Sequence, residues 1–414
     1  MGFDSASIRS EFPIFEKKIN GKTLHYLDSA NSSHKPKSVI DAMSAFMREE
    51  YAPIGRSSYA LSVNASAAYE HARVKVAKFI NARSSQEVVF TKNATESLNL
   101  IVQSWGRANL RKGDAIVLTH MEHHANIVPW QMLAAEKGFL IRWVPLTSDY
   151  QLDLSNLDDL LKGAKAFSFT AVSNVLGTIN PTRLLCEAAH ARGAIAIVDG
   201  CQSVPHMLTD VQALGADMLV FSSHKMCGPT GVGVLWAKEE LLESMPPFLG
   251  GGGMISDVRL DYFTCASVPA KFEAGTPPIV EVIGLGAAID FLNTIGMHEV
   301  RSHEIELTNY AYNILTQRYG DGITIHGPTN PDLRGATFSF AFRDVHPHDV
   351  SQVLDQRNVC VRSGHHCAKP LMRLIGANAT VRASMYVYST KDDVHALSDA
   401  LSDVDAMFTA AAQL

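Results

Sequence analysis

Apolar runs typical of β-strands alternate with helical segments between about residues 80 and 240. The stretch 87–105 (EVVFTKNATESLNLIVQSW) predicts a strand, a tight turn and a helix, and 114–130 (DAIVLTHMEHHANIVPW) repeats that order. A third run, 166–181 (AFSFTAVSNVLGTINP), predicts a strand that ends in polar residues. This alternation of strands and helices is typical of a doubly wound α/β fold with a mainly parallel sheet.

The pattern of apolar and polar residues changes after about residue 290. An amphipathic stretch (EVRSHEIELTNYAYNILTQRY) is followed by short strand-like runs such as GATFSFAF. This pattern predicts a second, smaller α+β domain, which the N-terminal segment joins. We therefore expect a large domain over 20–288 and a small domain made of 1–19 with 289–414.

Two apolar runs, AIAIV (194–198) and ADMLVFSS (216–223), are each followed by residues suited to chemistry. Asp199 comes directly after the first run, and Lys225 comes just after the second. Because parallel strands bring their carboxyl ends to one edge of a sheet, these two side chains should lie close together. A lysine with a nearby acid is what pyridoxal phosphate (PLP) requires. A helix-capping Asp and a solvated Lys are the alternative at this point.

Other polar residues lie at the ends of the predicted strands. Free N–H groups where a helix begins, near Thr95, favour an anion such as phosphate, although an ordinary helix cap would give the same pattern. His123 is an imidazole that could stack on a pyridine ring, or a structural histidine, as His124 is expected to be. The remaining candidates are two further phosphate donors, Ser222 and His224, and two neutral hydrogen-bonding side chains for the ring's phenolic oxygen, Asn174 and Gln202.

Composition narrows the classes of protein. The chain has 414 residues, 46% hydrophobic and 19% charged, and a formal charge of −6, which argues against general binding to nucleic acid or an anionic membrane. Its six cysteines form no CxxC pair, and no secretory signal is visible, so we expect a cytoplasmic protein with free thiols. The histidines of HPHD (346–349) and GHHC (364–367) do not have conventional zinc spacing, so we expect no intrinsic metal.

The chain resembles the SufS-type cysteine desulfurases, which are class V aminotransferases of PLP fold type I, over nearly its whole length. The resemblance implies a large domain with a mainly parallel seven-stranded sheet flanked by helices, plus the smaller C-terminal α+β domain. The matching segments are YLDSA (26–30), FINARSSQEVVF (79–90), MEHHANIVPWQML (121–133), VSNVLGT (172–178), SSHKMCGPTGVGVLW (222–236), FEAGTP (272–277) and RSGHHCAKPLM (362–372).

The resemblance assigns a role to each candidate. Lys225 would form the Schiff base and remove the α-proton, Asp199 would hold the pyridine nitrogen, and His123 would stack on the ring. Cys367 would attack the substrate sulfur and carry it as a persulfide. The remaining implied roles are phosphate binding (Thr95, Ser222, His224), binding of a neighbouring subunit's phosphate in a homodimer (Thr276), binding of the ring oxygen (Asn174, Gln202) and binding of the substrate (Arg362, Arg382, Asn174).

The implied reaction converts L-cysteine to L-alanine and passes sulfur towards iron–sulfur cluster assembly. A selenocysteine lyase, a different class V transaminase and a PLP-free scaffold for sulfur-transfer partners are the alternatives. The sulfur acceptor would be a SufE-type or a zinc-containing SufU-type protein. The HPHD segment resembles desulfurases of the second kind, so His348 is expected to reach the partner's zinc, unless it only caps a helix that begins near Asp349.

The chain also departs from the common pattern of this family. Asn31 replaces a common Ala, and Cys201 replaces another. Asn93 stands where a small residue is usual, and Gly55 and Tyr59 stand where many relatives carry histidines. We therefore expect the substrate entrance to differ more from that of relatives than the cofactor site does.

Overall fold

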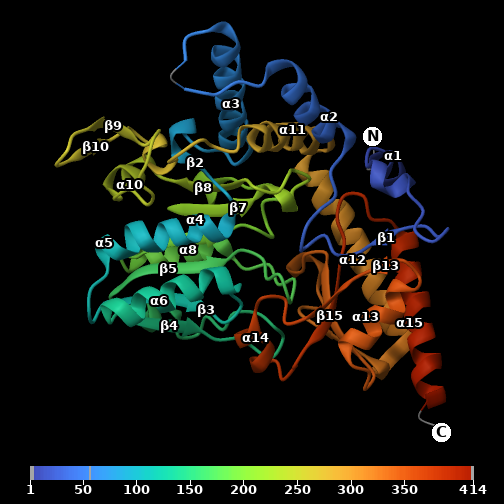
Figure 1. Cartoon of the computed structure of the whole chain (residues 1–414). Coiled ribbons are helices and arrows are strands. Elements are labelled where there is room, and N and C mark those ends of the chain that lie inside the picture. Colours follow the sequence, from blue (N-terminus) through green and yellow to red (C-terminus); the bar gives the residue numbers. More distant parts are fainter. Residues whose placement is uncertain (1–3, 56, 412–414) are drawn as a thin grey trace.

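A computed structural model describes residues 4–55 and 57–411 of the chain. A seven-stranded sheet forms the centre of its larger part, and Figure 1 shows this sheet with helices packed along it. The predicted mainly parallel sheet is confirmed, since only β8 runs antiparallel to its two neighbours. In spatial order the strands are β2 (Val88–Thr91), β8 (Gly233–Ala237), β7 (Met218–Ser222), β6 (Ile195–Asp199), β5 (Ala164–Thr170), β3 (Ala115–Thr119) and β4 (Leu140–Val144).

Side chains on the two faces of this sheet enter two separate hydrophobic cores. On β3, Val117 packs into one core, whereas Ile116 and Leu118 pack into the other. Burial on both faces explains why these strands appear as continuous apolar runs rather than as alternating ones. Each fully buried aliphatic side chain contributes roughly 1.5–3 kcal/mol.

Helices cover both faces of the large sheet. Buried residues of α3, α8 and α11 belong to the first core, and those of α4 and α6 belong to the second. The longer helices are α2 (Lys37–Ala45), α3 (Ala60–Phe79), α4 (Ala94–Ile101), α6 (Val128–Lys137), α8 (Thr182–Ala191) and α11 (Ile279–Ile295). The shorter ones are α1 (Ser5–Ser10), α5 (Arg107–Asn109), α7 (Leu157–Leu161), α9 (Val211–Leu214) and α10 (Glu239–Ser244), with π-helical turns at Phe46–Glu50 and Val102–Gly106.

The C-terminal part contains an antiparallel sheet in the order β11 (Ile323–His326), β12 (Thr337–Phe342), β15 (Thr380–Ser384) and β14 (Arg362–Gly364). Figure 1 shows this part, in orange and red, beside the large sheet. The helices here are α12 (Met297–Tyr319), α13 (Pro347–Asp355), α14 (Lys369–Leu374) and α15 (Lys391–Ala411).

The N-terminal segment is attached to the C-terminal part of the chain. Strand β1 (His25–Tyr26) pairs in parallel with β13 (Val359–Cys360), and Arg9 forms an ion pair with Asp393 of α15. These contacts explain how both ends of the chain can build one unit. The domain boundaries at 19/20 and 288/289 stay a prediction.

Strands β9 (Ile255–Val258) and β10 (Phe263–Cys265) form an antiparallel hairpin that projects from the large domain in Figure 1. Within the described residues, no single helix is long and apolar enough to cross a membrane. By length and composition, α11 together with the following helical stretch to Gly322 passes that test only as a pair bent by 72°.

Candidate active site

A cavity of about 300 Å³ opens at the carboxyl ends of the parallel strands, where the two parts of the chain meet. It brings together most of the residues that the sequence predicted. Those that line it are Thr95, His123, Asn174, Asp199, Gln202, Ser222, His224, Lys225, Arg362, Cys367 and Arg382. A larger surface groove of about 750 Å³, beside α1, α2 and α11, contains none of these residues.

Lys225 and Asp199 reach the cavity from neighbouring parallel strands, as the sequence predicted. Asp199 is the last residue of β6, is 4% exposed, and accepts a hydrogen bond from the backbone N–H of Cys201 at 3.0 Å. Lys225 ends the short 3-10 turn Ser223–Lys225 that directly follows β7. A buried carboxylate and an amine therefore line one cavity, the arrangement that holds a protonated ring nitrogen and a carbonyl carbon of one ligand.

The N-terminus of α4 forms the anion-binding corner of the cavity. Asn93 caps this helix by accepting a hydrogen bond from the N–H of Glu96, and Ser222 Oγ accepts one from the N–H of Ala94. Thr95 lies in the first turn, where the helix dipole favours an anion. A Cβ atom at Gly233 would lie only 2.4 Å from the carbonyl carbon of Asn93, so glycine is what allows β8 to support the helix so closely.

Two histidines of the cavity are held in the neutral form. Burial, strengthened by the nearby Lys225 charge, lowers the pKa of His123. The pKa of His224 falls to about 4, mainly because of burial and also because of Lys225. His123 begins the turn after β3, where its Nδ1 accepts from the N–H of Ala125. A neutral imidazole can stack on an aromatic ring without the cost of desolvating a charge.

A buried carboxyl group, Glu122, supports the loop that carries His123. It is 0% exposed and interacts with Thr119 Oγ1 at 2.5 Å, Asn126 Nδ2 at 2.7 Å and the backbone N–H of Thr170 at 3.0 Å. Burial raises its pKa to about 8. The sequence analysis missed this residue, because nothing in the local sequence sets it apart from an exposed acidic residue in a loop.

Cys367 sits in a loop held in an unusual backbone conformation. His366 and Cys367 both have left-handed φ values, of 51° and 56°, which cost roughly 1–2 kcal/mol per non-glycine residue. The loop is fixed because the N–H of His124 donates to Cys367 O at 2.8 Å, and Asn174 Nδ2 donates to His366 O at 2.7 Å. The side chain of His124 also holds this region, because its Nε2 accepts a hydrogen bond from the N–H of Lys369 at 2.9 Å. Such conformations persist where the surroundings over-determine them, commonly at functional sites.

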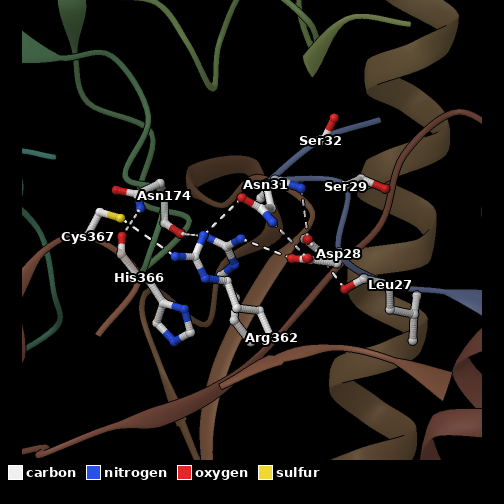
Figure 2. A network of polar contacts seen from close by, with 12 residues as sticks. Leu27, Asp28, Ser29, Asn31, Ser32, Asn174, Arg362, His366 and Cys367 are labelled. Atoms are coloured by element: carbon white, nitrogen blue, oxygen red, sulfur yellow. Dashed lines mark hydrogen bonds and ion pairs between the residues drawn. The ribbon is translucent and has the colours of Figure 1, made fainter. Parts of the chain in front are cut away.

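Two arginines flank the thiol loop. The Arg362 guanidinium lies with Nη2 3.6 Å from Cys367 Sγ, as Figure 2 shows. Arg382 is 1% exposed; its Nη1 donates to Asn174 O at 3.0 Å and its Nη2 to Asp28 Oδ1 at 3.2 Å. Arg382 Nε is buried and has no hydrogen-bond partner among the described residues. A buried guanidinium with an unused donor is suited to binding a carboxylate.

Two predicted residues lie outside this cavity. Thr276 lines a separate small cavity with Lys92 and Glu96 and is not among the residues that line the cavity of Lys225. His348 is exposed on α13 and forms a hydrogen bond through Nδ1 with Ser363 Oγ at 2.9 Å. The alternative that His348 caps this helix is wrong, because His346 is the capping residue and accepts from the N–H of His348.

The residues of the cavity fit pyridoxal phosphate. The donor set comprises an amine, a buried carboxylate, a neutral imidazole and a helix N-terminus with hydroxyl groups beside it. These groups match the aldehyde, ring nitrogen, ring face and phosphate of the cofactor in turn. Among the described residues there is no group of three or more His, Cys, Asp or Glu side chains that could hold a metal ion.

Comparison with known proteins agrees with this geometry. The sequence matches the family described as Aminotransferase class-V over residues 25–397. The chain belongs to this family. It is 49% identical to a probable cysteine desulfurase of Streptomyces coelicolor over 98% of each chain, and 45% identical to a cysteine desulfurase of an Enterobacter species over 98% and 99%.

Solved structures show the same fold. The apo structure of a cysteine desulfurase from Thermococcus onnurineus superposes with a TM-score of 0.92 at 38% identity, covering 96% of this chain and 97% of that one. The S-sulfonic acid form of the cysteine desulfurase CsdA from Escherichia coli gives 0.90 at 36% identity, covering 98% and 100%. The fold type I assignment from the sequence is thereby confirmed.

Proposed function

We propose that this chain is an L-cysteine desulfurase that uses pyridoxal phosphate and releases L-alanine. The observation that carries the proposal is that one cavity contains Lys225, Asp199, Arg382 and a held thiol, Cys367. Relatives that share 44–49% of the sequence over nearly the full length are described as cysteine desulfurases, some as probable ones. A transaminase needs the lysine and the acid, but it has no use for a nucleophilic thiol at the same place.

Each cofactor-binding residue has a task that follows from its chemistry. When bound, pyridoxal phosphate supplies an electron sink for the charge left after the α-proton of an amino acid is removed. Lys225 provides the amine that takes this proton, Asp199 keeps the ring nitrogen protonated, and His123 covers the ring. The phosphate is assigned to Thr95, Ser222 and His224, and the ring oxygen to Asn174 and Gln202.

The substrate is assigned to the two arginines and the thiol. Arg382 binds the α-carboxylate through its fork of N–H donors, and Arg362 adds positive charge beside Cys367. The Cys367 thiolate attacks the substrate sulfur, so that a sulfur–sulfur bond forms while the carbon–sulfur bond breaks. The carbon that loses sulfur takes up a proton, and the balanced products are alanine and a Cys367 persulfide.

The experiment that tests this function is an assay of the purified enzyme with L-cysteine and a thiol reductant. Alanine and sulfide should form in equal amounts, because the reductant releases sulfur from the persulfide. The same assay with L-selenocysteine tests the alternative lyase function. A kcat/KM for L-cysteine on the order of 10³-fold lower than for L-selenocysteine would favour the lyase. Failure to release alanine from either substrate would contradict both.

The active unit is proposed to be a homodimer with shared sites. Thr276 lines a cavity other than the one that contains Lys225. The Gly250–Gly253 segment lies beside the loop that carries Thr276, because the N–H of Gly275 donates to Gly252 O at 2.7 Å. Large apolar side chains that are exposed in the single chain support a partner surface. They lie on α2, the π-helical turn and α3 (Ile40, Met47, Leu61, Val63) and on the hairpin (Val258, Leu260, Tyr262, Phe263). We propose that Thr276 binds the phosphate held by the neighbouring subunit.

The sulfur acceptor is proposed to be a small SufU-type or SufE-type protein in iron–sulfur cluster assembly. His348 is exposed, and its Ser363 contact ties it to β14, the strand that begins with Arg362. An exposed imidazole near the thiol loop can replace a thiolate on a partner's zinc. Freed in this way, the partner's cysteine could accept sulfur from Cys367.

Adding a SufU-type partner should therefore raise alanine formation, and His348→Ala should remove most of that rise while basal turnover is kept. His395→Ala is a matched control, since His395 is another histidine of the small domain, on α15. Titration of turnover against partner concentration measures the effect. Stimulation that is equal in wild type and His348→Ala would leave His348 without this role and reopen the choice of acceptor.

A further inference from the structure

A chain of polar contacts links the thiol to the buried arginine through Asn31. Arg362 uses Nη2 towards Cys367 Sγ (3.6 Å) and donates from Nη1 to Asn31 Oδ1 (3.0 Å). Asn31 Nδ2 donates to Asp28 Oδ2 (3.1 Å). The other oxygen of Asp28 accepts from Arg382 (3.2 Å). Figure 2 shows the Arg362 guanidinium with Cys367 on one side and Asn31 on the other.

The partners of Asn31 determine which way its amide points. A guanidinium can only donate and a carboxylate can only accept, so Oδ1 must face Arg362 and Nδ2 must face Asp28. Asn31 therefore stands as a neutral group between a cation and an anion. Both oxygens of Asp28 are engaged, one by Arg382 and one by Asn31. Arg362 is thus bonded to an uncharged oxygen rather than paired with a carboxylate.

This arrangement matters because Arg362 is the cation that lies against the thiol. A guanidinium that forms an ion pair with Asp28 would turn away from Cys367, and its charge would be compensated. A thiolate is stabilised by an adjacent uncompensated cation, and the thiolate is the reactive form of cysteine. Asn31 lines the same cavity and is exposed at its mouth.

We propose that Asn31 is a positioning residue, which holds Arg362 against Cys367 and keeps it from pairing with Asp28. The proposal rests on the proposed function of Cys367 as the sulfur-accepting thiol. The amide of Asn31 bridges an Arg362 donor and an Asp28 oxygen. An alanine at position 31 would leave both of these groups without that bridge.

Two variants separate positioning from charge. Asn31→Ala removes both hydrogen bonds and leaves Arg362 free to turn towards Asp28. Asn31→Asp can still hold the guanidinium in place but compensates its charge. The rate of Cys367 alkylation by iodoacetamide, a neutral reagent, should fall about three- to tenfold in the alanine variant of the holoenzyme, the scale of the net contribution of one typical hydrogen bond. It should fall by at least as much in the aspartate variant.

Cys265 on β10 provides an internal control, because it lies on the hairpin rather than beside the arginines. Its alkylation, mapped by mass spectrometry in the same samples, should not change. A merely structural loss at Asn31 would increase the reactivity of several thiols rather than lower that of one. Unchanged alkylation of Cys367 in both variants, or a parallel change at Cys265, would overturn the proposal.

A double-mutant cycle decides whether Asn31 acts through Arg362. In an Arg362→Gln background, Asn31→Ala should change the rate of Cys367 alkylation by less than about twofold, because the group it positions is already gone. A full additional effect in that background would overturn the proposal. Persulfide mapping after exposure to L-cysteine is scored separately. Absence of sulfur on Cys367 in the wild type would contradict the proposed function, whereas the alkylation rates alone decide the role of Asn31.

Discussion

Replacing Lys225 with alanine should abolish both the absorption band of the Schiff base between this lysine and the cofactor and the release of alanine from L-cysteine. Lys225 is the amine that follows β7 and lines the same cavity as Asp199. Loss of a positioned base that also bonds the cofactor should lower turnover by on the order of 10³-fold or more. The measurement combines the absorption spectrum of the purified protein with an assay for alanine.

A matched control keeps a general effect of lysine loss apart from the effect at the site. Lys165 is an exposed lysine on β5, a strand of the same sheet, and Lys165→Ala should keep both the spectrum and the turnover. Added pyridoxal phosphate should still bind to the Lys225→Ala protein, because the anion-binding corner at the N-terminus of α4 is intact. Normal turnover in Lys225→Ala would show that another group removes the α-proton and that the assignment is wrong.

The sequence predicted those parts of the site that depend on local pattern. Asp199 ends one buried strand and Lys225 follows the next. Because parallel strands place such residues at one edge of a sheet, the local pattern alone was enough to predict that they meet. The roles of Cys367, Arg362 and Arg382 came from resemblance to a family. Their meeting in one cavity with Asp199 depends on contacts between the two parts of the chain, which no local pattern determines.

Other parts could not be predicted because they depend on distant partners. Asn31 contacts Arg362, 331 positions away in the chain. It stood out only as a departure from a common alanine. Glu122 gave no signal at all, since its burial depends on how the loop after β3 folds. The alternative in which His348 caps the helix was wrong by two residues. Both His346 and His348 lie at the start of α13, and the sequence does not show which imidazole accepts the hydrogen bond.

The physical environment separates Cys367 from four of the other five cysteines. Burial raises the pKa of Cys227 to about 12 and that of Cys201 well above its usual value. Burial also raises the pKa of Cys186, to about 12, and that of Cys360. These four thiols are therefore protonated and weakly nucleophilic near neutral pH. Cys367, by contrast, lies on the cavity beside Arg362.

Cys367→Ser should therefore lower alanine formation from L-cysteine by on the order of 10²-fold or more while the visible absorption of the cofactor is kept. The hydroxyl is too weak a nucleophile to take the substrate sulfur, whereas Lys225 and Asp199 are unchanged. Cys360→Ser is the matched control, a thiol of the same part of the chain on β13, and should turn over normally. Alkylation mapping of the wild type after brief exposure to L-cysteine should find the added sulfur on Cys367. Sulfur found chiefly on Cys201 or Cys227, with Cys367 unmodified, would mean that the wrong thiol has been assigned.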